Sequence, residues 1–221
     1  MLIRRLVQFI IFLMGLFFSL IYLSNVSTEL TAEDKAAFMA EGFLPSNHTL
    51  NYDEQIKLIA NLQSQVLDKF PIGDGIPLFE EREPANLNTY RRGLCFDRSR
   101  YLDKLLKYKG FSTRHIYILY DTGENFIISL LTKGHPSHAV TQVLTQRGWL
   151  VVDSNSNYLA LDKNNTPISL DELEAENPEF SESFRKKFWA IIGLYSRNGA
   201  FYKPYLLVPE LNLIDFLANF F

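Results

Sequence analysis

The stretch Arg91-Arg92-Gly93-Leu94-Cys95-Phe96-Asp97-Arg98-Ser99 decides how the rest of the 221-residue sequence is interpreted, because it contains the only cysteine. Beyond it, leucines at 102, 105 and 106 recur with a helical period until Gly110. This pattern predicts a helix that begins at or near Cys95. Backbone N–H groups and the dipole at a helix start favour an anion, so they favour the thiolate form of a cysteine placed there.

Composition and charge limit the class of protein. Hydrophobic residues make up 47% of the chain and aromatic residues 14%, enough for the core of one ordinary domain. The net charge of −3, with acids and bases well mixed, argues against a nucleic-acid partner. One cysteine cannot form an internal disulfide, and no histidine and cysteine cluster has zinc spacing, so we expect neither a cofactor nor a metal.

The N-terminal segment has the features of a membrane anchor. Arg4 and Arg5 precede residues 6 to 23, which carry no charge, and Glu29, Glu33 and Asp34 follow. We therefore expect residues 1–27 to form a transmembrane helix, with a cleaved signal peptide as the alternative. The positive-inside bias predicts a single-pass cell-membrane protein with a cytoplasmic N-terminus and a periplasmic or extracellular domain.

The remaining sequence indicates an α+β domain. Residues 28–50 are polar and irregular apart from a short helical patch around Ala32–Glu41, which predicts a tether, and residues 51–221 are expected to form the domain with a C-terminal extension. Hydrophobic residues at helical spacing predict a helix over Tyr52–Phe70, and residues 71–92 are expected to be a long loop. We expect strands at Arg114–Tyr120, Asn125–Leu131, His138–Leu144 and Trp149–Asp153, which together suggest an antiparallel sheet with helices on one side.

The last two predicted strands can pair a histidine with a carboxylate. If Thr145-Gln146-Arg147-Gly148 forms the hairpin loop, Leu144 faces Trp149, and Asp153 becomes the diagonal neighbour of His138 on the same face of the sheet. A register shifted by one pair places the two residues directly opposite each other. Either register places a carboxylate within reach of the imidazole, whereas an odd-length loop would turn the side chains to opposite faces.

Such a pair is what a cysteine nucleophile requires. The imidazole of His138 can accept the proton of the Cys95 thiol, and the carboxylate of Asp153 can orient the ring. Backbone N–H groups at the helix start can stabilise the oxyanion, with Asn86, Asn88 or Tyr90 as candidate side-chain donors. In isolation, each of the three residues also has a structural interpretation, since a lone cysteine is commonly a small buried hydrophobe.

Three blocks of this sequence resemble the transglutaminase-like superfamily: Arg92-Gly93-Leu94-Cys95-Phe96-Asp97-Arg98-Ser99, Ser137-His138-Ala139-Val140, and Gly148-Trp149-Leu150-Val151-Val152-Asp153-Ser154. Their order and spacing also suit that family, and the resemblance covers residues 52 to 158. It implies a papain-like α+β core, with the nucleophile helix packed on an antiparallel sheet. It also implies Cys95 as nucleophile, His138 as base and Asp153 as orienting acid. Val140 departs from the family, many of whose members have Trp there.

We therefore expect a membrane-anchored, extracytoplasmic cysteine enzyme that cleaves or transfers an acyl group at an amide bond. Its substrate would be a protein, a peptide or another amide of the cell envelope. The alternative is a catalytically inactive binding or scaffold module on the same fold. Asp97 lies two positions after the nucleophile and would oppose thiolate formation if it pointed inward. Arg91, Arg92 and Arg98 could bind an acidic substrate group, although a solvated face is the expected role.

Overall fold

The computed structural model of the chain describes residues 2–23, 25–45, 50–77, 80–132, 134–173, 180–195 and 210–220. The helices are α1 (Leu2–Leu23), α2 (Ala32–Ala40), α3 (Tyr52–Lys69), α4 (Pro84–Tyr90), α5 (Cys95–Tyr108), α6 (Phe126–Leu131), α7 (Leu170–Leu173), the 3-10 turn η1 (Glu182–Phe184) and α8 (Leu213–Leu217). The strands are β1 (Thr113–Tyr120), β2 (Ser137–Thr145), β3 (Gly148–Asp153), β4 (Phe188–Ile192), β5 (Leu194–Tyr195) and β6 (Glu210–Leu211).

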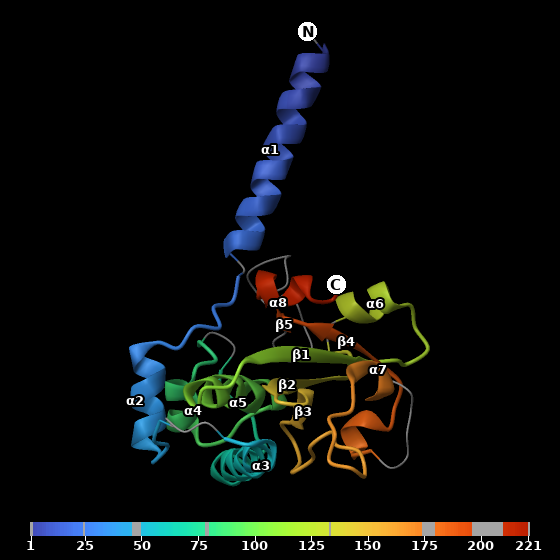
Figure 1. Cartoon of the computed structure of the whole chain (residues 1–221). Coiled ribbons are helices and arrows are strands. Elements are labelled where there is room, and N and C mark those ends of the chain that lie inside the picture. Colours follow the sequence, from blue (N-terminus) through green and yellow to red (C-terminus); the bar gives the residue numbers. More distant parts are fainter. Residues whose placement is uncertain are drawn as a thin grey trace.

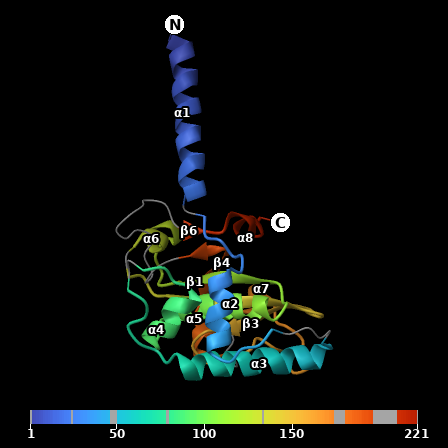
Figure 2. The same cartoon turned by 90° about the vertical axis from the view of Figure 1, so that its left-hand side faces the viewer.

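An antiparallel sheet in the order β3-β2-β1-β4 forms the centre of the body, and β5 pairs separately with β6. Helix α5 lies across the sheet, with α3 beyond it and α2 and α4 at the side (Figures 1 and 2). This α+β arrangement, with the cysteine helix packed on an antiparallel sheet, agrees with the layout expected from the sequence.

The leucines of α5 hold this helix on the sheet. Leu102, Leu105 and Leu106 are fully buried, as the helical spacing predicts, and they share one core with α3 and with strands β2 and β3. Burying each leucine side chain contributes roughly 2 kcal/mol. The members of this core include Ile59, Leu62, Val66, Tyr101, Val143, Leu150 and Val152. The start of α5 is therefore fixed relative to the β2–β3 hairpin.

A second core covers the other face of the sheet. It combines alternate residues of β1, β2 and β3 with the chain between β3 and the end of β4. Its members include Ile116, Ile118, Val140, Val151, Phe184 and Phe188. Because the sheet is buried on both faces, polar side chains on its strands can be enclosed by protein, and His138 is one of them.

The β2–β3 hairpin has the first of the two predicted registers. Leu144 pairs with Trp149 and Val140 with Asp153, so Asp153 is diagonal to His138, as expected from the loop length. The ladder also includes Thr145 and Gly148, which leaves Gln146 and Arg147 as the connecting residues. The shifted register, with His138 directly opposite Asp153, does not occur.

The membrane-anchor prediction is wrong. No helix in the described part of the chain is long and apolar enough to cross a membrane, so a single-pass membrane protein and the cellular placement derived from it are not supported. Arg4 and Arg5 occupy the start of α1, so its uncharged run begins only at residue 6. Helix α1 extends away from the body (Figures 1 and 2).

The short helical patch expected around Ala32–Glu41 is present as α2, but it is docked on the body instead of belonging to a free tether. Helix α2 begins at an N-cap, Thr31, whose side chain accepts a hydrogen bond from the backbone N–H of Asp34 at 3.1 Å. On its inner face, Phe38 is fully buried against the ring of Tyr101, and Asp34 forms a buried ion pair with Lys104 at 2.7 Å. These contacts hold α2 against the α4 and α5 side of the body (Figure 2).

Two other segments differ from their predicted structure. The expected loop over residues 71–92 contains α4, which begins with Pro84 at a position where proline is favoured and ends at Arg91 in the left-handed conformation. The expected strand over Asn125–Leu131 is helix α6, because the Asn125 side chain caps the N–H of Ile127 at 2.9 Å and starts a helical turn.

The segment after α1 pairs with the C-terminal segment. Asn25 forms a β-bridge with Leu211, whose carbonyl accepts the N–H of Val26 at 2.8 Å. In return, the Asn212 side chain donates to the carbonyl of Val26 at 2.9 Å, and the N–H of Leu213 donates to Asn25 Oδ1 at 3.0 Å. The two ends of the described chain therefore meet on the side of the body from which α1 departs (Figure 1).

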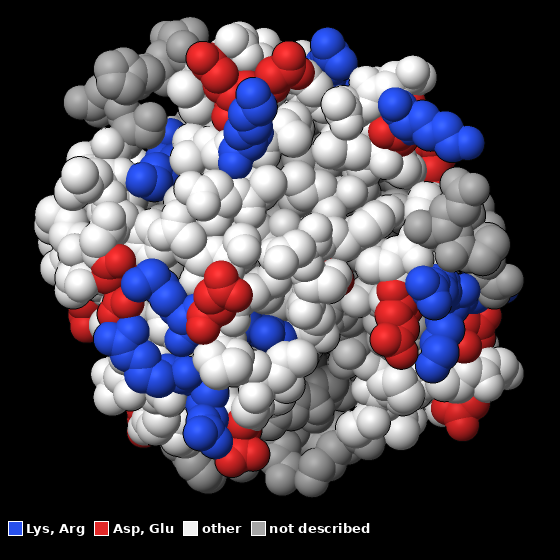
Figure 3. Space-filling view, turned by 90° about the horizontal axis from the view of Figure 1, so that it is seen from below, with Lys and Arg blue, Asp and Glu red and all other residues white. Residues whose placement is uncertain are grey.

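The face opposite α1 has mixed charge. Figure 3 shows Lys and Arg side chains interspersed with Asp and Glu around a mostly uncharged centre. This distribution on that face matches the small net charge of −3.

Candidate active site

Cys95 is the first residue of α5, and it is partly buried. Its backbone N–H is among those at a helix start that have no partner within the helix. The thiol therefore lies at the positive end of a helix of 14 residues, as the sequence predicts. This position can favour a thiolate and can also offer a backbone donor to an oxyanion.

The thiol opens into a cleft with a volume of about 500 Å³. One wall comes from the loop after α3, and the other from the connection between α6 and β2. The lining residues are Gly73, Asp74, Leu94, Cys95, Phe96, His135 and Ser137. A cleft of this size, with polar and apolar groups beside a cysteine, can admit part of a peptide.

His138 and Asp153 meet as the hairpin register requires. His138 Nε2 lies 2.6 Å from Asp153 Oδ1, and both side chains are buried. The Cys95 side chain lies close enough to His138 to contribute to the upward shift of its pKa. The structure thus brings together the three residues that the sequence analysis selected, with the imidazole between the thiol and the carboxylate.

The surroundings of His138 favour its charged form. Burial alone lowers the pKa of this histidine, but hydrogen bonds to Asp153 and Cys95, together with their negative charges, raise it to about 9. Because Nε2 faces Asp153, the nitrogen left to exchange a proton with the thiol is Nδ1. An imidazolium beside a cysteine is the arrangement that stabilises a thiolate.

The Asp153 carboxylate is held from several directions. Oδ1 accepts the N–H of Asn155 at 3.1 Å, while Oδ2 accepts the hydroxyl groups of Ser156 at 2.6 Å and Ser183 at 3.1 Å. Burial raises the pKa of Asp153, yet the hydrogen bonds and the charge of His138 outweigh it, so the net shift is downward. Gln63 of α3 also donates to the backbone carbonyl of Asp153 at 2.8 Å. The acceptor is therefore preorganised and ionised.

The charge of the Asp97 carboxylate is engaged by other groups: it caps the start of α5 and pairs with Arg82. Its carboxylate accepts the N–H of Leu94 at 2.8 Å and that of Ile76 at 3.3 Å, and it pairs with Arg82. A Cβ on Gly75 would collide with this carboxylate. Asp97 therefore joins the start of α5 to the loop that forms one wall of the cleft.

The predicted side-chain donors to the oxyanion all lie elsewhere. Asn86 donates to the carbonyl of Glu81 at 2.7 Å, Asn88 to the carbonyl of Ala37 at 2.9 Å, and Tyr90 to Glu80 at 2.5 Å. None of these three residues is among the described residues that line the cleft beside Cys95. The expectation was wrong because α4 turns these residues toward α2 and toward the preceding loop.

Sequence reasoning missed two residues of the site. Arg98, expected on a solvated face, is only 2% exposed and lies near Cys95 and Asp153. His135, which the sequence analysis did not single out, lines the cleft and places Nε2 at 2.8 Å from the carbonyl oxygen of Tyr120. The sequence did contain a signal for Arg98. Residues three apart on a helix share a face, so Arg98 is expected on the same face as Cys95.

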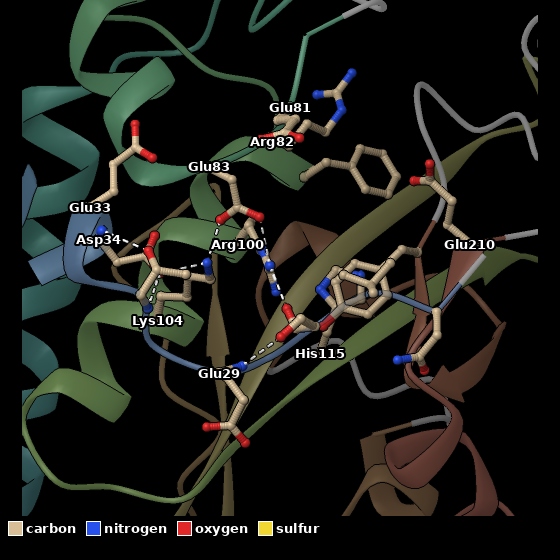
Figure 4. Close-up of a pocket in the computed structure, with 16 residues that line it drawn as sticks. Glu29, Glu33, Asp34, Glu81, Arg82, Glu83, Arg100, Lys104, His115 and Glu210 are labelled. Atoms are coloured by element: carbon tan, nitrogen blue, oxygen red, sulfur yellow. Dashed lines mark hydrogen bonds and ion pairs between the residues drawn. The ribbon is translucent and has the colours of Figure 1, made fainter. Parts of the chain in front are cut away.

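A second hollow, of about 380 Å³, lies on the other side of Phe96, which lines both hollows. Figure 4 shows its buried charges paired with one another. Glu83 accepts from Arg100 at 2.8 Å, and Lys104 pairs with both Glu83 and Asp34. These pairs attach α2 and the start of α4 to α5, so we interpret this hollow as part of the scaffold.

Metal ligation and similarity to known proteins add no further assignment. Within the described ranges, no three His, Cys, Asp or Glu side chains form a group that could hold a metal ion. No protein-family model matches the chain, and no curated protein matches it.

Proposed function

We propose that the chain is a cysteine enzyme of the transglutaminase-like type, which hydrolyses or transfers an acyl group at an amide bond of a protein or peptide. The observation that carries the proposal is that His138 lies between the side chain of Cys95 and the carboxylate of Asp153. Cys95 itself lies at a helix start that faces a cleft. Nucleophile, base and orienting acid are thus within reach of one another.

The first half-reaction forms a thioester. The Cys95 thiolate attacks the amide carbonyl carbon, and the backbone N–H of Cys95 donates to the oxyanion that develops. His138 then gives its Nδ1 proton to the leaving nitrogen, the C–N bond breaks, and the amine departs. Asp153 holds the ring through Nε2 during this transfer, and it stays ionised.

The second half-reaction releases the acyl group. His138, now neutral, takes a proton from water or from a second amine as that molecule attacks the thioester carbonyl. The C–S bond breaks and Cys95 is regenerated. Water yields a hydrolase and an amine yields a transferase.

The test is the reactivity of Cys95 against pH. We expect iodoacetamide to alkylate the wild-type thiol rapidly well below pH 8, and the His138→Ala variant to be alkylated much more slowly at the same pH. Asp171→Asn, in the exposed first turn of α7, serves as the control and should behave as wild type. Slow alkylation that is unaffected by His138→Ala would overturn the enzyme proposal and favour an inactive binding module.

A further inference from the structure

Arg98 is buried in a way that requires an explanation. It lies one helical turn after Cys95 on α5, and the residue is only 2% exposed. Among the residues that the structure describes, no carboxylate lies within ion-pairing distance of its guanidinium, and the buried Nε has no hydrogen-bond partner. Enclosing a cation in this way is costly unless nearby charges compensate for the lost water.

The hydrogen bond that Arg98 does make leads to His138. Nη2 of Arg98 donates to Oδ1 of Asn155, and Nδ2 of the same amide lies 3.5 Å from Nδ1 of His138. A guanidinium can only donate, so the amide oxygen must face Arg98 and the NH2 group must face the imidazole. An NH2 group can only donate to a ring nitrogen that is unprotonated, so this contact favours neutral His138.

The charges that surround the imidazole come from several elements. Helix α5 contributes the Cys95 thiol and the Arg98 guanidinium, β1 contributes His115 and Tyr120, and the end of β3 contributes Asp153. Burial lowers the pKa of Arg98, and the negative charges of Cys95, Asp153 and Asp97 offset part of that shift. Arg98 is therefore a positive charge close to Cys95.

We propose that Arg98 is a positioning residue of the site, which holds the amide of Asn155 over His138 and supplies a permanent positive charge beside Cys95. This inference rests on the proposed function and extends it. The charge favours the thiolate even after His138 has lost its proton, while the amide favours the neutral ring that must accept a proton in the second half-reaction. Binding of an acidic substrate group would instead require an exposed guanidinium, which Arg98 does not have.

The first experiment separates charge from shape. Arg98→Met removes the charge and keeps much of the apolar stem, whereas Arg98→Lys keeps the charge and loses the planar guanidinium. We expect the pH of half-maximal Cys95 alkylation to rise by about one unit in Arg98→Met and by clearly less in Arg98→Lys. Arg91→Met is the matched control, because the Arg91 side chain is 56% exposed and pairs with Glu41 at the end of α2.

The second experiment follows His138 directly by NMR titration of its ring, which does not depend on turnover. Loss of the amide in Asn155→Ala removes a donor to the neutral ring, so we expect the titration midpoint to rise by about half a unit. Asn157→Ala, at an exposed position two residues later, is the control and should leave the midpoint unchanged. Thermal unfolding of each variant verifies that it is folded.

The two proposals can fail separately. Equal alkylation midpoints in Arg98→Met and Arg98→Lys, or an unchanged His138 titration in Asn155→Ala, would overturn the role of Arg98 and Asn155 and leave the enzyme proposal standing. Alkylation of wild-type Cys95 that ignores His138→Ala would overturn the enzyme proposal. The His138 titration would still report whether Asn155 contacts the ring.

Discussion

The β2–β3 hairpin and the segment from residue 71 to 97 form two sides of the same site, and they are held by different forces. The hairpin places His138 and Asp153 through a regular ladder of backbone hydrogen bonds. The 71–97 segment depends on one buried carboxylate, Asp97, which binds Arg82 and the N–H groups of Leu94 and Ile76.

Because of this difference, we expect substitutions in the hairpin to affect the reaction and substitutions in the 71–97 segment to affect the shape of the cleft. A substitution at the end of the hairpin removes a group that moves or directs a proton but leaves the ladder intact. A substitution at Asp97 leaves the three proposed reacting groups in place but releases the wall of the cleft. We therefore expect the hairpin variants to lose rate more than stability, and the loop variants to lose stability more than rate.

The largest effect is expected at Asp153. Asp153→Asn keeps the shape of the side chain, but the amide cannot hold His138 in the required tautomer, so the rate of amide hydrolysis should fall on the order of 10³- to 10⁴-fold. The measurement is turnover of a library of peptide amides, with Asp171→Asn as the matched control. A fall of less than about tenfold would show that Asp153 does not orient the ring.

The largest loss of stability is expected in the loop. Asp97→Asn leaves the largely buried Arg82 without its charge partner, so the free energy of unfolding should fall by about 4 kcal/mol. Urea denaturation measures this change. The double variant Asp97→Asn with Arg82→Met should recover part of the loss, because it removes the unpaired charge. A loss under about 1 kcal/mol would mean that water satisfies Arg82.

We expect the free energy of unfolding to depend on pH through His138, which lies on the hairpin. The folded-state pKa of His138 is raised to about 9, so its stabilising contribution is complete below the unfolded value near 6.5 and is lost as the pH rises through about 9. We expect unfolding free energy to fall by about 3 kcal/mol across this window. Urea curves at several pH values test this expectation. His138→Gln should abolish the dependence, whereas a dependence that survives this change would contradict the assignment.

The smallest effect is expected at the turn that touches Asp97. Gly75 has a φ of +73°, and an added Cβ would collide with the Asp97 carboxylate, so Gly75→Ala should cost about 2 kcal/mol. Gly42 has a φ of +84° but open space around it, so Gly42→Ala should cost about 1 kcal/mol and isolates the backbone strain. Thermal unfolding measures both. Equal losses would show that the contact with Asp97 adds nothing.

The predictable part of the fold was the part governed by local geometry. The register that makes Asp153 diagonal to His138 follows from the length of the turn around Gln146 and Arg147, and the buried face of α5 follows from its leucine spacing. These features depend on residues close in sequence. Local patterns therefore sufficed to bring His138 and Asp153 together, whereas the choice of Cys95 as nucleophile also rested on the resemblance of three sequence blocks.

The features that escaped prediction depend on contacts between distant segments. The buried Arg98 donates to Asn155, which is 57 residues away in the sequence. The docking of α2 depends on the pairing of Asp34 with Lys104, 70 residues away. Helix α6 was missed for a different reason, because one capping bond from Asn125 outweighed the strand preference of the isoleucines that follow.

The pairing of the two chain ends defines a path for mechanical force. A force applied to α1 acts first on Asn25 and Val26, and the hydrogen bonds of these residues transmit it to Leu211 and the C-terminal segment. Strand β6 pairs in turn with β5, and the N–H of Gly193, next to β5, donates to the carbonyl of His115 on β1 at 2.8 Å. These bonds transmit the force to the central sheet. Arg100 and Lys107 of α5 donate to the carbonyls of Ser27 and Thr28, so a second path leads from the same segment directly to the Cys95 helix. A force on α1 is therefore shared between the C-terminal segment and α5.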